Sequence, residues 1–393
     1  MHITSIYNKI FFFIFFAMVF AYDMNLNLDF LKYFAIGITI IATIINLRGK
    51  FPKRKFELMI LMLFPLIVSS LFQNTTFPQK LTSFVFYITF LVWMLFGDNI
   101  LTTIDSVYYS VLGVCSGTFA VIITSWSMMY TQLANIYNSR QRVWWAFPHA
   151  NTLGSIASAS IVALICFLIF KKNKLSKLRL LVVIAEFTFM SVILIGTRSR
   201  TSEITIVIFL TVLLFSRLRK FSKLVRIVSY SLIILGIVFG SVFFIKEYAL
   251  SDAAFEARLL IFQRLQTNLQ TTIVGNGMVD FANLNTQNAN GASGEIAAVT
   301  LFYKNGIIGL IVYVVVFATL FFQISSVQDK TRKTVSYALM FSVLVGSLGE
   351  ALIVNITNVS PMLTLMLMSS VIFNTRWDGA ESDKSELLEV NKS

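Results

Sequence analysis

Apolar runs long enough to cross a lipid bilayer follow one another along almost the whole chain, separated by short polar connectors. A helix needs about 20 apolar residues to cross the hydrocarbon core, and about 17 suffice. On this scale the sequence predicts twelve spans, at 8–22, 30–47, 56–72, 81–97, 105–125, 152–170, 178–196, 202–216, 225–246, 298–322, 334–350 and 352–374. The expected fold class is all-α, a polytopic membrane protein with about twelve transmembrane helices.

Composition agrees with a chain solvated mainly by lipid, because 56% of its 393 residues are hydrophobic and only 13% are charged. The net charge of +13 does not indicate nucleic acid, since the basic residues lie in short connectors between apolar runs. The run after Lys9 resembles a signal peptide, but apolar runs continue to residue 374, so we expect an uncleaved first span. Cys115 and Cys166 lie within apolar runs and are expected to be packing residues.

Four connectors carry dense basic clusters, and all four fall on the same side of a twelve-span chain. Their residues are Arg48, Lys50, Lys53, Arg54 and Lys55; Lys171, Lys172, Lys174, Lys177 and Arg179; Arg217, Arg219, Lys220, Lys223 and Arg226; and Lys330, Arg332 and Lys333. Cytoplasmic connectors are enriched in Lys and Arg, which predicts that this side and both termini are cytoplasmic. The 97–105 connector is the exception, because it carries Asp98 and Asp105 and no base.

The expected organisation is one polytopic membrane domain over 1–376, followed by a disordered cytoplasmic tail at 377–393. Two connectors on the outer side are long, at 126–151 and 247–297. The second contains EARLLIFQRLQTNLQ (256–270), whose apolar residues recur at helical spacing. This pattern predicts an amphipathic helix along the membrane interface.

Six arginines fall on the outer side, where the charge bias disfavours them: Arg140, Arg142, Arg198, Arg200, Arg258 and Arg264. The planar guanidinium forms two parallel charge-assisted bonds with a phosphate, so several from different connectors could hold a pyrophosphate. The alternative for any one of them is snorkelling, or pairing with Glu247 or Glu256. That alternative is weakest for the short connector GTRSR (196–200), which has two arginines close to span ends.

Two further outer features have both a functional and a structural interpretation. His149 lies where the 126–151 connector re-enters the membrane, and it is either a proton-transfer group or a loop hydrogen-bonder. Asn151 and Thr152 follow it and could cap the next helix. The GNG tripeptide at 275–277 is a phosphate-binding nest or an ordinary turn. The sequence contains no Walker loop and no zinc-ligand spacing.

Several stretches together resemble the bacterial O-antigen polymerase and O-antigen ligase superfamily of multi-span glycosyltransferases. RVWWAFPHANTLG (142–154) is similar to the family's entry to a span, an Arg and an aromatic followed by His-Pro-Asn-x-Leu-Gly. GTRSR (196–200) resembles its Thr-Arg turn between two spans, and ARLLIF (257–262) with VGNG (274–277) resembles the helix and Gly-x-Gly turn of its large outer loop. KNGIIGL (304–310) matches its Gly-Ile-Ile-Gly signature. The resemblance covers roughly residues 140–320.

The resemblance implies a glycan donor linked through pyrophosphate to undecaprenol, bound by Arg142, Arg198 and Arg258. Arg200, Arg264 and Glu350 are possible additional site residues. Ligases of the superfamily carry a His-Asn pair about eleven residues before the Gly-Ile-Ile-Gly, where this chain has Glu295. This departure favours a polymerase in which Glu295 takes the proton of the attacking sugar hydroxyl, with His149 as the competing base.

The family further implies a metal-independent enzyme without a cofactor, in the bacterial cytoplasmic membrane with its site facing outward. Its partners would be the lipid-linked donor, an acceptor glycan, membrane lipid and a chain-length regulator protein. Three functions compete: a polymerase of O-antigen, capsule or other polysaccharide repeats; a ligase that transfers a finished chain to lipid A-core or another acceptor; and a flippase for lipid-linked oligosaccharide. A flippase predicts similar halves and short outer connectors, which this sequence lacks.

Overall fold

The computed structural model describes residues 2–26, 28, 30–47, 52–71, 77–127, 132, 134, 142–171, 175–218, 269–275, 297–349 and 359–374. All the regular structure in these ranges is helical, which confirms the predicted all-α class for this part of the chain. The helices are α1 (His2–Phe20), α2 (Phe30–Leu47), α3 (Lys53–Leu71), α4 (Phe77–Ile100), α5 (Ile104–Thr124), α7 (Ala150–Lys171), α8 (Lys177–Thr197), α9 (Arg200–Leu218), α12 (Leu269–Val274), α14 (Ala297–Ser325), α15 (Lys330–Gly349) and α16 (Val359–Phe373).

Six of the described helices are long and apolar enough to cross a membrane. They are α2, α5, α7, α8, α9 and the Asn305–Ser325 part of α14. Three shorter apolar helices cover Lys9–Phe20, Tyr87–Ile100 and Val359–Phe373. These findings describe a membrane-embedded helical protein, while the number of twelve spans stays a prediction.

The predicted spans overlap the described helices where both can be compared, but the predicted span at 298–322 is not one continuous helix, because Gly306 interrupts α14. The span at 30–47 coincides with α2, and the spans at 178–196 and 202–216 lie within α8 and α9. The span at 225–246, the amphipathic helix at 256–268 and the tail at 377–393 lie outside the described residues, as do the first residues of the last span. Hydropathy places helices well because each span must be apolar over its whole length.

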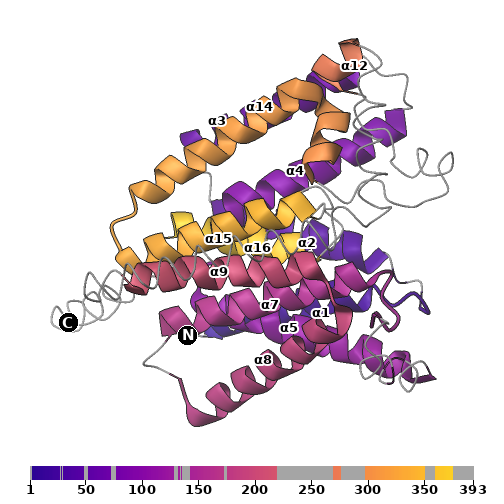
Figure 1. Cartoon of the computed structure of the whole chain (residues 1–393), viewed down its shortest axis with the longest axis vertical. Coiled ribbons are helices and arrows are strands. Elements are labelled where there is room, and N and C mark those ends of the chain that lie inside the picture. The colour runs from indigo at the N-terminus through magenta and orange to yellow at the C-terminus, as the bar shows by residue number, and fades with distance from the viewer. Residues whose placement is uncertain are drawn as a thin grey trace, which may run out of the picture.

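Helix α7 lies inside the bundle, and most of its residues are buried. It contacts α5, α8, α9 and α16. Figure 1 shows α8 at one margin of the bundle and α3 and α14 toward the other, with α15 and α16 between. The small residues of α7, among them Ser155, Ser158 and Ser160, allow its neighbours to approach on several sides.

Two glycines one turn apart explain the close packing of α1 on α5. A Cβ on Gly113 would lie 3.1 Å from the Phe12 Cα, and a Cβ on Gly117 would lie 2.9 Å from the Phe16 carbonyl oxygen. The backbones therefore meet at positions that tolerate no side chain. Small residues spaced by four let membrane helices approach in this way.

Ion pairs join the helix ends that carry the basic clusters, on a surface that we call the basic face. The Lys55 Nζ lies 2.6 Å from an Asp98 carboxylate oxygen. Asp105 pairs with both Lys171, at 3.0 Å, and Arg179, at 2.9 Å. The two acids of the 97–105 connector, the exception to the charge pattern, thus neutralise bases from neighbouring connectors.

Hydrogen bonds extend the basic face to the last helices. The Asn374 amide donates to the Thr102 carbonyl oxygen at 2.9 Å, and the hydroxyls of Ser216 and Thr334 lie 2.9 Å apart. These contacts bring the ends of α9 and α16 and the start of α15 to the same face. Which side of a membrane this face meets stays a prediction.

Candidate functional site

The described arginines of the candidate site lie around the 197–200 turn, where α8 ends and α9 begins. Arg198 caps α8 with left-handed backbone angles, φ 50° and ψ 38°, and its N–H donates to the Ile195 carbonyl oxygen at 3.3 Å. Such angles are uncommon for a residue with a side chain and occur where the surroundings fix them. The Ser199 carbonyl oxygen accepts from the Glu203 N–H at 3.0 Å, so α9 starts at once. The result is a tight reversal that presents Arg198 between two helix ends.

The first turns of α7 pack directly on this reversal. A Cβ placed on Gly154 would lie 2.9 Å from the Thr197 Oγ1 and 3.0 Å from the Ser199 Oγ. The Ser199 and Ser202 hydroxyls lie 2.8 Å apart on the same side of the turn. Any larger residue at Gly154 would push the 197–200 turn away from α7, so the two predicted motifs at 142–154 and 196–200 meet in space.

Arg142 ties three segments together. Its Nε donates to the Thr197 carbonyl oxygen at 2.8 Å, and its Nη2 donates to the Asn151 Oδ1. The neighbouring Val143 N–H donates to the Gly196 carbonyl oxygen at 3.0 Å. Arg142 therefore connects the segment before α7, the first turn of α7 and the end of α8. Both of these bonds go to neutral oxygens, which orient the guanidinium.

His149 is exposed immediately before α7, and its ring is oriented by the backbone. The Nδ1 accepts a hydrogen bond from the Asn151 N–H at 3.1 Å. A neutral imidazole that accepts at Nδ1 carries its proton on Nε2. In this arrangement His149 offers an N–H donor to a bound group, which suits hydrogen bonding to an oxyanion better than removal of a proton. Its predicted catalytic role stays a prediction.

The connector between α1 and α2 packs against the segment that precedes α7. The sequence did not predict this contact. The Met24 N–H donates to the Ala146 carbonyl oxygen at 3.1 Å, and Tyr22 lies against Phe147 with 6.1 Å between ring centroids. Asp23, which is 1% exposed, accepts a hydrogen bond from Thr124. The Lys32 Nζ lies 4.5 Å from the centre of the Tyr22 ring and places another cation near this end of the bundle.

Two other predicted motifs meet at the junction of α12 and α14. Gly306 interrupts α14 with φ 62° and ψ −162°. A Cβ there would lie 2.7 Å from the Gly275 nitrogen, which belongs to the GNG tripeptide after α12. The break therefore needs glycine for both its backbone angles and its close approach. Figure 1 shows α12 at the margin of the bundle opposite α8.

Several predicted site residues cannot be placed against this geometry. Arg140, Arg258, Arg264, Glu295 and Glu350 lie outside the described residues. Arg200 is the exposed first residue of α9, and its charge interacts with that of Glu203 in the same turn. The structure thus brings together Arg142, His149, Arg198 and Arg200 at one end of the bundle, within two adjoining segments.

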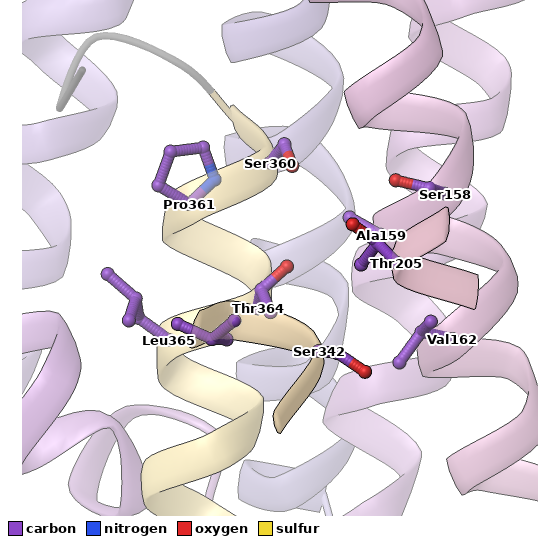
Figure 2. A pocket seen from close by; sticks show the side chains of 10 residues that line it. Ser158, Ala159, Val162, Thr205, Ser342, Ser360, Pro361, Thr364 and Leu365 are labelled. Carbon is purple, nitrogen blue, oxygen red and sulfur yellow. The ribbon is translucent and has the colours of Figure 1, made fainter. Parts of the chain in front are cut away.

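A small cavity with a mainly apolar lining and five hydroxyl-bearing residues lies between α7, α9, α15 and α16. Figure 2 shows the side chains of Ser158, Thr205, Ser342, Ser360 and Thr364 around it. Its free volume is about 20 Å³, which is enough for about one water molecule. Ser158 lies one helical turn beyond Gly154, so the cavity is close to the 197–200 turn, but it is far too small for a sugar.

The described residues contain no group of three or more His, Cys, Asp or Glu side chains that could hold a metal ion. The positive groups of the candidate site are arginines, which can hold a phosphate by charge and hydrogen bonds. The expectation of a metal-independent reaction remains a prediction. No protein-family model and no curated protein matches the chain.

Proposed function

We propose that this chain is a polysaccharide polymerase that joins lipid-pyrophosphate-linked repeat units at the outer face of the bacterial cytoplasmic membrane. The observation that carries the proposal is the fixed position of Arg198. It caps α8 in a left-handed conformation within the 197–200 turn, which packs against Gly154 and is hydrogen-bonded to Arg142. An arginine whose backbone is fixed at a helix junction, at the end of α8 away from the basic face, can present its guanidinium to a pyrophosphate.

The proposed reaction is a glycosyl transfer. The oxygen of an acceptor sugar hydroxyl forms a bond to the anomeric carbon of the donor glycan. The bond from that carbon to the pyrophosphate oxygen breaks, and undecaprenyl pyrophosphate leaves with the electron pair. Arg198 and Arg258 stabilise the charge that develops on the leaving group. Glu295 accepts the proton of the hydroxyl.

In this mechanism Arg142 has a different role from Arg198 and Arg258. Its bonds to Thr197 and Asn151 hold the 197–200 turn against α7, and its charge adds to the positive field there. His149, with its Nε2–H directed away from the backbone contact, would donate to a pyrophosphate oxygen. The orientation follows from the charge bias: the basic face is cytoplasmic, both termini lie inside, and twelve spans place the arginines outside.

The test is the polysaccharide made by a deletion strain complemented with the wild-type gene or with Arg198→Ala. Loss of polymerase activity leaves single repeat units attached to the normal acceptor. Long unattached chains would indicate a ligase, and accumulation of lipid-linked units on the inner leaflet would indicate a flippase. Either of these two results would overturn the proposal, as would a full-length ladder in the deletion strain. The matched control is Arg54→Ala, which removes an exposed arginine at the basic face.

A further inference from the structure

A single carboxyl group lies near the middle of helix α8, in a position that the glycosyl transfer does not use. Glu186 is the tenth residue of α8, which runs for 21 residues from Lys177 to Thr197. At 1.5 Å per residue it lies about 14 Å from the start of the helix. In a spanning helix this depth is close to the centre of the hydrocarbon core.

The Glu186 side chain faces the protein interior and not the lipid. The residue is 6% exposed, and neither carboxyl oxygen has a hydrogen-bond partner. It lies at the interface between α5 and α8, near Tyr108 and Cys115 of α5. One turn further along, Phe189 of α8 contacts Phe119 of α5 edge to face, with 6.2 Å between ring centroids.

The cations at this interface are already engaged with another acid. Arg179 precedes Glu186 by two turns on α8, and it pairs with Asp105 at 2.9 Å and lies over the Tyr108 ring. Helix α7, the other neighbour of α8, carries Cys166 and Lys171 as its titratable side chains, and Lys171 also pairs with Asp105. Among the described residues, an ionised Glu186 would therefore have no partner to offset the desolvation of its buried charge.

We propose that Glu186 is a proton-binding site inside the membrane, held as the neutral acid between α5 and α8. Ionisable groups within membrane spans are costly and mark functional positions. Ile184 and Phe187, which flank Glu186 on α8, are exposed, so an apolar reagent dissolved in the lipid reaches the helix surface beside the buried carboxyl. The proposal does not depend on the glycosyl-transfer function.

A hydrophobic carbodiimide reports directly on such a group, because it reacts with the acid form of a carboxyl. The acid proton moves to one carbodiimide nitrogen, and a carboxyl oxygen bonds to the central carbon. The acyl group then migrates to a nitrogen and gives an N-acylurea. No group leaves, so the peptide gains the whole mass of the reagent.

The experiment treats membranes that contain the full chain with N,N′-dicyclohexylcarbodiimide at neutral pH, followed by mass spectrometry of the peptides. We expect one adduct on Glu186, less of it as the pH rises, and none in Glu186→Gln. Glu203→Gln, which changes an exposed acid near the start of α9, keeps the adduct. A water-soluble carbodiimide at the same concentration is expected to leave Glu186 unmodified.

Absence of the adduct on wild-type Glu186 would overturn the proposal, and so would labelling that increases with pH. Peptide mapping of the wild-type protein needs no variant, so misfolding of Glu186→Gln cannot obscure the result. Stability gives a second measurement. The neutral isostere Gln should leave the melting temperature in detergent unchanged, whereas a marked loss would mean that a charged Glu186 stabilises the fold and would also overturn it.

Discussion

The two ends of α8 hold their arginines in different ways. At the basic face, Arg179 forms an ion pair with Asp105, which Lys171 shares. At the opposite end, Arg142 bonds the Thr197 carbonyl oxygen and the Asn151 amide oxygen. An acidic partner neutralises the charge of an arginine, whereas hydrogen bonds to carbonyl and amide oxygens fix the orientation of its guanidinium. The first arrangement suits a structural end of a bundle, and the second suits a site for an anion.

The largest effect is expected from Arg198→Ala, which removes a proposed pyrophosphate ligand. Loss of one preorganised group that stabilises developing charge typically costs about 10²–10³ in rate. Chain extension should fall by this factor, as measured from the polysaccharide ladder at equal protein level. Arg54→Ala at the basic face should extend chains normally. Equal ladders from both variants would remove the functional difference between the two ends.

The next effect is expected at the basic face, from Asp98→Ala. The side chains of Lys55 and Asp98 are only 9% and 14% exposed, so the variant leaves a nearly buried ammonium without its carboxylate. Since this pair lies at the end of the helices, we expect a loss of stability of about 2–3 kcal/mol. Thermal unfolding in detergent measures it. Residual folded protein at low temperature should still extend chains, in contrast to Arg198→Ala.

A smaller effect is expected from Arg142→Lys. Lysine keeps the charge but cannot bond Thr197 and Asn151 in the planar geometry of a guanidinium. We expect activity to fall about tenfold, equivalent to about 1.4 kcal/mol, with a small drop in melting temperature. Asn151→Ala should have a similar effect, and the double variant should lose less than the sum, because both act through one contact. Additive losses would show that Arg142 acts independently of Asn151.

The smallest effect is expected from Asp105→Asn, which weakens the pairs with Lys171 and Arg179. These side chains are 21–31% exposed, so water screens them in part. Stability should fall by about 1 kcal/mol or less, and less still at high salt. Unfolding curves at low and high ionic strength measure this difference. A reduced rate of chain extension in folded Asp105→Asn would contradict the separation of the two ends.

The helices could be predicted from the sequence because their signal is local. A span must be apolar throughout, and α2 coincides with the predicted 30–47. The sequence predicts that arginines of the 142–154 and 196–200 stretches converge on one ligand. It does not predict that the two stretches pack against each other through Gly154. Nothing in the spacing indicates that Gly154 needs to lack a side chain, because its contacts with Thr197 and Ser199 come from another part of the chain.

The roles of individual charges were harder to predict, for the same reason. Asp98 and Asp105 are exceptions to the charge pattern in the sequence, and only the structure shows that they pair with Lys55, Lys171 and Arg179. Arg142 and Arg198 are alike in the sequence, yet Arg142 bonds to the 197–200 turn from another segment, whereas Arg198 belongs to that turn and caps α8. The sequence did not single out Glu186, because the mean hydropathy of the 178–196 run stays high when one of its residues is an acid.

Because the 197–200 turn packs against Gly154, substitutions in two segments more than 40 residues apart in the sequence depend on each other. Thr197 and Ser199 lie within 3.0 Å of the place where a Cβ on Gly154 would be. A change to alanine at position 154 requires a smaller residue at 197 or 199 to make room for the added methyl group. If the residue at 197 or 199 became smaller first, a gap would remain beside Gly154. Related sequences should therefore vary at these three positions together, keeping their combined volume nearly constant.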